Sequence, residues 1–233
     1  MEQTLKITNV LSDPTRYYIY QYVTQKHDEV TVQEIADNFN IHPNVARLHL
    51  SKLEDVNMLV SETKKTGKGG RPSRLYRLSN DVIQLHFPYR DYQLLSNIAI
   101  QTMASLGEPG QKALYETGKK FGEELIKQEL SRNQQSVSAL TFDQKLNMIK
   151  NASTLAGLSP EFQANEDNTK VSFQIFNCPF KEIAVDHIES ICQMHAQYLK
   201  GMFSSLFSDV ELVEGDNLLN GCEACTYKAS IIN

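Results

Sequence analysis

The chain has 233 residues, of which 41% are hydrophobic and 22% are charged, and its formal net charge at pH 7 is −5. This length is sufficient for two domains with separate cores, and the composition is that of an ordinary globular protein. No apolar run approaches the roughly 18 residues of a membrane span. The N-terminus lacks the basic-then-apolar layout of a secretory signal, so we expect a cytoplasmic protein without structural disulfides.

Two helices are expected in the first forty residues. Ser12-Asp13-Pro14 is a helix start, with Ser12 as a plausible N-cap, and the helix is predicted to run through Thr24. Thr31 with Glu34 three residues on predicts a capping box. The helix that follows carries a single apolar stripe formed by Ile35, Ala36 and Phe39.

A second short helix is predicted to begin at Pro43, since proline suits the first helical position. Its inward arc contains Ala46, Leu50, Leu53 and Asn57. Its opposite face carries Asn44, Arg47, Leu48 and Ser51. Two short helices joined by a tight turn are typical of a helix-turn-helix when the second helix exposes a mainly polar face of this kind. We expect Arg47 and Asn44 to read base edges and Leu48 to meet a thymine methyl group.

A basic hairpin is predicted after this helix, with strands over 58–65 and 74–78 and a glycine-rich tip between them. Residues 44–77 hold eight Lys or Arg and three acidic residues, within a chain of net negative charge. Such a local excess favours phosphate binding, so the sequence predicts a winged helix-turn-helix; the alternative is a solvated hairpin on an ordinary helical domain. The expected phosphate or minor-groove contacts are Lys52, Lys64, Lys65, Lys68, Arg71 and Arg74.

The rest of the chain differs in charge and pattern. Residues 1–79 have a net charge of +2 and the remainder −7, so we expect that the C-terminal part does not lie along DNA. Helices over 91–106 and 111–130 are expected either to pair two protomers or to form an intramolecular bundle. Further helices over 142–155 and 185–207, with strands over 162–165, 170–176, 210–213 and 226–232, predict an α+β fold. The expected domains are a winged domain at 1–80, a helical linker at 81–130 and a C-terminal α+β domain at 131–233.

All four cysteines lie in the final quarter of the chain: Cys178, Cys192, Cys222 and Cys225. Cys192 is followed three residues later by His195, on the same face of the predicted helix. Brought together, four thiolates could saturate a tetrahedral zinc ion or hold an iron–sulfur cluster. Two alternatives stay open. The cysteines could be unrelated small core residues, or Cys222 and Cys225 could form a redox Cys-x-x-Cys pair.

At these residues the sequence resembles the SufR-like regulators, which have an ArsR-like winged helix in front of a cysteine-containing domain. The similarity covers the cysteine motifs Asn177-Cys178-Pro179-Phe180, Cys192-x-x-His195 and Cys225-Thr226-Tyr227, and the wing motifs Gly70-Arg71-Pro72 and Leu75-Tyr76-Arg77-Leu78. It implies a dimeric repressor that holds a [4Fe–4S] cluster through Cys178, Cys192 and Cys225. Cys222 departs from that pattern and could supply a fourth thiolate.

The sequence therefore predicts a homodimeric, DNA-binding transcriptional repressor whose C-terminal domain senses iron–sulfur or redox status. Three alternatives remain: a zinc-binding regulator, a thiol–disulfide enzyme that uses Cys222 and Cys225, and a small-molecule-responsive regulator in which the cysteines are incidental. No Ser/His/Asp set, phosphate loop or paired carboxylates are evident, so no enzymatic activity is predicted.

Overall fold

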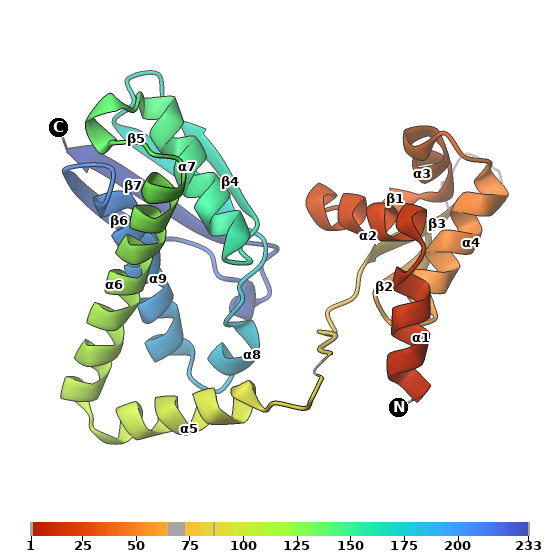
Figure 1. The fold of residues 1–233 in the computed structure, drawn as a ribbon, viewed down its shortest axis with the longest axis horizontal. Helices are drawn as coiled ribbons and strands as arrows, with labels where there is room; N and C mark the ends of the chain where they lie inside the picture. Colours follow the sequence, from red (N-terminus) through yellow and green to blue (C-terminus); the bar gives the residue numbers. More distant parts are fainter. Residues whose placement is uncertain (1, 65–72, 86, 233) are drawn as a thin grey trace. The chain divides into compact units, whose positions relative to one another are not determined.

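The structure, a computed structural model, describes residues 2–64, 73–85 and 87–232. The chain divides into two compact units, Met1–Arg90 and Asp91–Asn233 (Figure 1). Each unit combines helices with a small antiparallel sheet, so the predicted α+β class is confirmed. The region predicted as a linker over 81–130 is divided between them, because residues from Asp91 onward belong to the second unit.

The first unit has the topology of a winged helix. Its helices are α1 (Glu2–Leu11), α2 (Pro14–Lys26), α3 (Val32–Phe39) and α4 (Pro43–Glu54). Its strands are β1 (Val30–Thr31), β2 (Leu59–Lys64) and β3 (Ser73–Leu78), in the sheet order β1-β3-β2. The sequence analysis did not predict α1 or β1. Both are explained by tertiary contacts, since α1 buries Ile7 and Val10 in the core of this unit and Val30 pairs with the fully buried Tyr76.

The helix starts of the first unit differ in detail from the prediction. Asp13, not Ser12, caps α2, and its carboxylate accepts a hydrogen bond from the Arg16 amide at 3.0 Å. Thr31 caps α3 as predicted, accepting from the Glu34 amide at 3.1 Å. The Glu34 carboxylate, which forms the other half of the predicted capping box, is also influenced by the Thr31 backbone amide, but its main partners are on α2.

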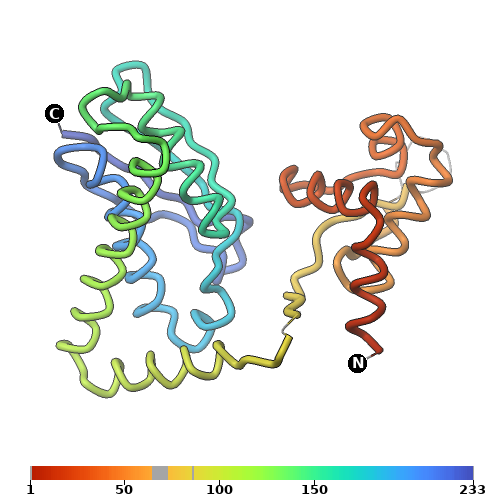
Figure 2. The backbone as a smooth tube through the Cα atoms, viewed as in Figure 1, coloured from red at the N-terminus to blue at the C-terminus, as the bar shows by residue number. Residues whose placement is uncertain are grey.

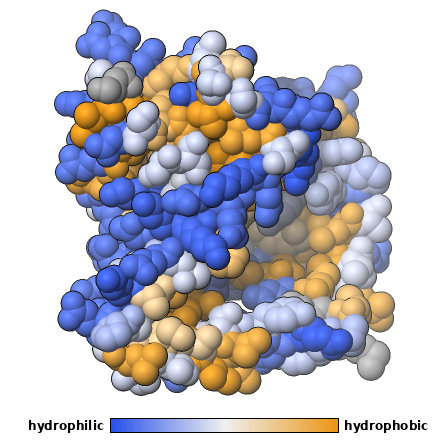
Figure 3. Space-filling view, turned by 60° about the vertical axis from the view of Figure 1, so that its left-hand side comes forward, coloured by the Kyte–Doolittle hydropathy of each residue, from blue (hydrophilic) through white to orange (hydrophobic). Residues whose placement is uncertain are grey.

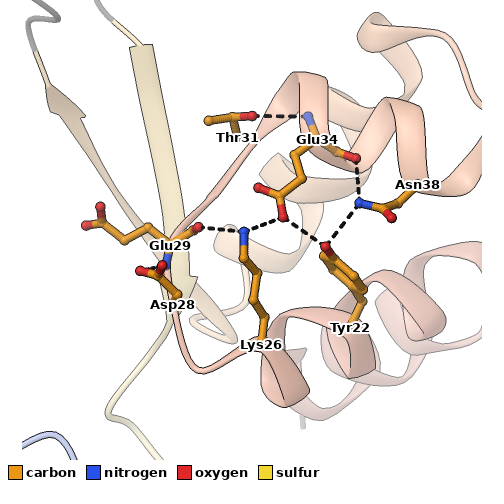
Figure 4. A network of polar contacts seen from close by, with 7 residues as sticks. All are labelled: Tyr22, Lys26, Asp28, Glu29, Thr31, Glu34 and Asn38. Carbon is orange, nitrogen blue, oxygen red and sulfur yellow. Dashed lines mark hydrogen bonds and ion pairs between the residues drawn. The ribbon is translucent and has the colours of Figure 1, made fainter.

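Glu34 joins α3 to α2 through a polar network that Figure 4 shows. Its Oε1 accepts a 2.8 Å hydrogen bond from the Tyr22 hydroxyl and forms an ion pair with Lys26. Burial raises the pKa of the Glu34 carboxyl, but these two partners outweigh it and hold the pKa below its usual range. The network therefore fixes the first helix of the helix-turn-helix against α2.

The second unit is a four-stranded antiparallel sheet with helices packed against it. Its helices are α5 (Tyr92–Ser105), α6 (Glu108–Arg132), η1 (Val137–Ala139), α7 (Phe142–Leu155), α8 (Lys181–Ala184), α9 (Ile188–Ser204) and η2 (Leu218–Asn220). Its strands are β4 (Pro160–Ala164), β5 (Lys170–Ile175), β6 (Asp209–Glu214) and β7 (Cys225–Ile232). The order is β4-β5-β7-β6, so the last strand of the chain returns between β5 and β6 (Figure 2).

An aromatic stack forms the centre of this second core. The ring of Phe173 on β5 stacks on Phe203 of α9 at 5.4 Å and on Tyr227 of β7 at 5.1 Å between centroids. Alternate residues of β5 are buried, which places Val171, Phe173 and Ile175 against the helices. The core therefore ties β7, which begins at Cys225, to α9, which carries Cys192.

One predicted helix of this unit is wrong in extent. The helix predicted over 185–207 is α9, which begins at Ile188 and ends at Ser204, and the short helix α8 before it was not predicted. Ile188, at the start of α9, is 47% exposed. Among the residues that the structure describes, no helix is both long and apolar enough to span a membrane.

Candidate functional site

The recognition helix α4 has a buried face and an exposed face, as the sequence predicts. Ala46, Leu50 and Leu53 are fully buried, whereas Leu48 is 55% exposed. Arg47 is also exposed, and its guanidinium donates a 3.2 Å hydrogen bond to the Asn44 side chain. The prediction that Asn57 faces inward is wrong. The helix ends at Glu54, and Asn57 lies exposed in a turn with φ +59°.

Several basic residues predicted to contact phosphate have carboxylate partners within the protein. The Lys64 ammonium binds Glu29 and Glu62, each at 2.8 Å. The Arg74 guanidinium binds the Glu54 carboxylate at 2.7 Å and the Ser61 hydroxyl at 2.8 Å, and Lys52 lies 3.4 Å from Asp55. Ser51 is half-buried on α4. The remaining predicted contacts, Lys65, Lys68 and Arg71, lie outside the described residues.

A cavity in the second unit brings together three of the four cysteines. Cys178 follows β5, Cys192 lies on α9 and Cys225 begins β7. The three side chains line one cavity, whose wall also includes His195 and Lys181. The remaining lining residues are Ala184, Ile191, Asn217, Leu218, Leu219 and Tyr227. Cys222 does not line the cavity, and its side chain is exposed.

Each of the three cavity sulfurs is contacted by a nitrogen. Asn217 Nδ2 lies 3.4 Å from the Sγ of Cys192, and the Leu218 amide donates to the Sγ of Cys225 at 3.3 Å. The Nδ1 atom of His195 lies 3.8 Å from the Sγ of Cys178. Donors to sulfur favour the thiolate, the form that binds metal. No sequence motif indicated Asn217 or Leu218, because their roles depend on where the chain folds back before β7.

Burial controls the protonation of this site. Burial, together with the charges of Cys225 and Cys192, raises the pKa of the Cys178 thiol to about 12. Burial also raises the pKa of Cys225. These two groups are therefore thiols at neutral pH unless a cation compensates their charge, and binding of a cation would release protons.

Among the described residues that line this cavity, His195 is the buried polar side chain with an unpaired atom. Burial lowers its pKa to about 4, so the ring is neutral at physiological pH. Its Nε2 atom has no hydrogen-bond partner, and the ring packs edge-on against Phe180 and Tyr227. A neutral imidazole with a free nitrogen can coordinate a metal or orient a neighbouring thiolate.

The residue types fit a thiolate-bound iron–sulfur cluster, but the cavity between them is too small to hold one as it stands. The cavity has a volume of about 10 Å³, space for about one water molecule. Among the described residues, no three His, Cys, Asp or Glu side chains converge closely enough to hold a single metal ion. Loading would therefore require the cavity walls to move apart.

Comparison with known proteins supports the assignment of the first unit. A family model described as a helix-turn-helix domain matches residues 11–62. This span begins just before α2 and ends within β2. The predicted winged helix-turn-helix is thus supported, and with it a role as a DNA-binding transcription regulator. No curated protein sequence matches the chain.

Solved structures give only weak similarities. The sensory domain of the transcription activator PoxR with phenol shares 16% identity over 79% of this chain and 89% of its own, with a TM-score of 0.45. A trafficking protein particle complex subunit 3 from Naegleria fowleri, covalently bound to palmitic acid, shares 16% identity over 60% of this chain and 97% of its own, with a TM-score of 0.43. An H-NOX protein from S. oneidensis in the Fe(II)NO ligation state shares 15% identity over 67% of this chain and 84% of its own, with a TM-score of 0.42. At these scores the similarities carry no argument about ligand or function.

Proposed function

We propose that the chain is a homodimeric repressor whose DNA binding is controlled by a [4Fe–4S] cluster held by Cys178, Cys192 and Cys225. One observation supports this above all. Three cysteines from a loop, a helix and a strand line one cavity, and each sulfur is contacted by a nitrogen. When bound, such a cluster supplies a redox-active centre whose potential depends on hydrogen bonds to its sulfurs and on burial.

The residues around the cysteines would hold and tune the site. Asn217 and the Leu218 amide would stabilise the thiolates of Cys192 and Cys225, and thereby position them. His195 either provides a further ligand or orients Cys178. Tyr227 and Phe180, packed on the His195 ring, limit the access of water to that side of the cavity.

The chain also provides a route from the cavity towards the DNA-binding unit. Helix α8 lies in the segment between Cys178 and Cys192, its Ala184 lines the cavity, and it contacts α5. Because the cavity is too small as it stands, loading would displace one or more of its walls. Movement of α8 would then displace α5, which contacts it and is the first helix after the winged unit. In this mechanism the segment around α8 has two positions, and cluster binding and DNA binding each favour one of them.

Dimerisation is assigned to α5. Tyr92–Ser105 contains no charged residue, yet Tyr92, Leu94, Leu95 and Ile98 are each more than half exposed. Figure 3 shows apolar side chains along the lower edge of its view. An apolar helical face of this kind is typical of an interface, and a winged-helix regulator that reads two half-sites requires a dimer.

The substitution Ile98→Glu is expected to shift the protein from dimer to monomer at micromolar concentration, because a buried unpaired charge opposes association. Sedimentation velocity measures the change, with Gln93→Glu, at an exposed position on another side of the same helix, as the matched control. A variant that stays dimeric would exclude this face of α5 as the interface.

Metal analysis with visible spectroscopy, on protein purified without oxygen, tests the proposed cluster. We expect a brown protein with iron and sulfide, and loss of both in Cys178→Ser, Cys192→Ser and Cys225→Ser. Cys222→Ser is the matched control and should retain them, since its side chain does not line the cavity. A colourless protein with stoichiometric zinc would replace the cluster by a zinc site, and a metal-free protein would exclude both.

A further inference from the structure

Cys222 lies three residues before Cys225 in the chain and does not line the cavity. It is exposed, whereas Cys225 is buried, and the two are three residues apart across a bend. The loop that carries Cys222 is closed at its base. There the Gly215 amide donates to the Thr226 carbonyl at 2.8 Å, and the Thr226 amide donates to the Asp216 carbonyl at 2.9 Å. The Cys222 thiol is therefore tethered at one end of β7, open to solvent.

The three cavity cysteines and Cys222 differ in their accessibility to oxidants in solution. Cys178, Cys192 and Cys225 surround a space of about 10 Å³, which holds about one water molecule. Cys222 faces solvent, so an oxidant in solution meets this thiol first. A sulfenic acid formed there would have Cys225 three residues away in the chain, and a disulfide between the two requires their Cα atoms to lie within about 4.4–6.8 Å.

We propose that Cys222 is a resolving thiol that forms a disulfide with Cys225 when the cavity carries no cluster. The inference rests on the proposed function, because Cys225 cannot be a cluster ligand and a disulfide partner at once. Oxidised protein would be unable to reload until a thiol reductant restored Cys225. The predicted role of Cys222 as a fourth ligand is thereby replaced by a role in protecting or locking the unloaded protein.

The chemistry needs only a peroxide as co-reactant. The Cys222 thiolate attacks one peroxide oxygen, the O–O bond breaks, and Cys222 becomes a sulfenic acid as the first water equivalent leaves. The Cys225 sulfur then attacks the Cys222 sulfur, the S–S bond forms, the S–O bond breaks, and the departing hydroxide takes up the Cys225 proton as water. Two thiols are oxidised by two electrons, and one peroxide is reduced to two waters.

Peptide mass analysis of the full-length protein tests the inference. Protein stripped of metal by a chelator under reductant is desalted, treated with a small excess of hydrogen peroxide, and blocked with a maleimide before tryptic digestion. Cys222 and Cys225 fall in one tryptic peptide, 201–228, and the other two cysteines fall in different peptides. We expect this peptide to lose two hydrogens and to escape labelling, and dithiothreitol to reverse both changes.

Variants and the loaded protein make the result decisive. The Cys178→Ser variant should still form the disulfide between Cys222 and Cys225. The Cys222→Ser variant should form no disulfide within peptide 201–228. Iron-loaded protein should resist the same treatment. The inference is overturned if peptide 201–228 stays reduced, if Cys225 links to Cys178 or Cys192 instead, or if loading gives no protection. Absence of iron from the purified protein would contradict the proposed function alone, because the peptide mass tests the disulfide in either case.

Discussion

Substituting Gly122 with alanine is expected to destabilise the second unit by about 3 kcal/mol, at the upper end of the range for overpacking. A Cβ atom at Gly122 would lie 2.0 Å from the Tyr198 carbonyl oxygen, and one at Gly201 would lie 2.1 Å from the Lys119 carbonyl oxygen. The backbones of α6 and α9 are therefore in direct contact, and neither carbonyl can rotate away as a side chain would. In an unpacked helix the same change would add about 1 kcal/mol of stability.

Chemical denaturation followed by circular dichroism measures this effect. Gln128→Ala, at an exposed position of the same helix, is the matched control and should change the free energy of unfolding by less than about 0.5 kcal/mol. Gly118→Ala should fall between the two, since its Cβ would meet the Met194 carbonyl oxygen at 2.8 Å and the flexible Met194 side chain. Equal stability of Gly122→Ala and the parent protein would show that α6 and α9 separate freely.

This close packing also concerns the proposed sensor. Helix α9 carries Cys192 and His195, and its position is set by Gly201 against α6. A shift of α9 by the width of a methyl group would move the Cys192 sulfur relative to Cys225 on β7. We therefore treat the glycine pair as the support that positions the cysteine cavity.

The sequence predicts the first unit well because its signals are local. Thr31, Pro43 and the buried arc of Ala46, Leu50 and Leu53 depend only on the residues beside them. The failure at Asn57 has a local cause as well: α4 ends three residues earlier, and an asparagine with positive φ is typical of the turn that follows. Helix α1 has no comparable start or stop residues in the sequence and is stabilised by packing of Ile7 and Val10.

The cavity was only partly predictable. The spacing of the cysteines and His195 indicated a shared site, and the structure brings Cys178, Cys192, Cys225 and His195 to one cavity. The sequence could not place Asn217 or Leu218, since η2 folds over the sulfurs through long-range contacts. Nor did the sequence indicate α8. The helix predicted from Val185 begins only at Ile188, because the turn after α8 buries Ala184 and leaves Val185 exposed.

Replacing Arg47 with alanine is expected to weaken binding to the operator by about 1–3 kcal/mol, which corresponds to roughly 5- to 150-fold in Kd. Its guanidinium projects from the exposed face of α4, and among the described residues it has the Asn44 side chain as its hydrogen-bond partner. A bidentate contact to a guanine would replace that bond readily. Selection from a random duplex library defines the operator, and fluorescence anisotropy at fixed salt measures the affinity.

The pattern of sequence preference separates base reading from simple charge. Arg47→Ala should lose its preference at one position of each half-site, while Lys6→Ala, which removes the same charge from exposed α1, should change neither affinity nor preference appreciably. A uniform loss of affinity for all sequences, with a lower dependence on salt, would instead assign Arg47 to the phosphate backbone. In that case base reading would pass to Asn44 and Leu48, two further exposed residues of α4.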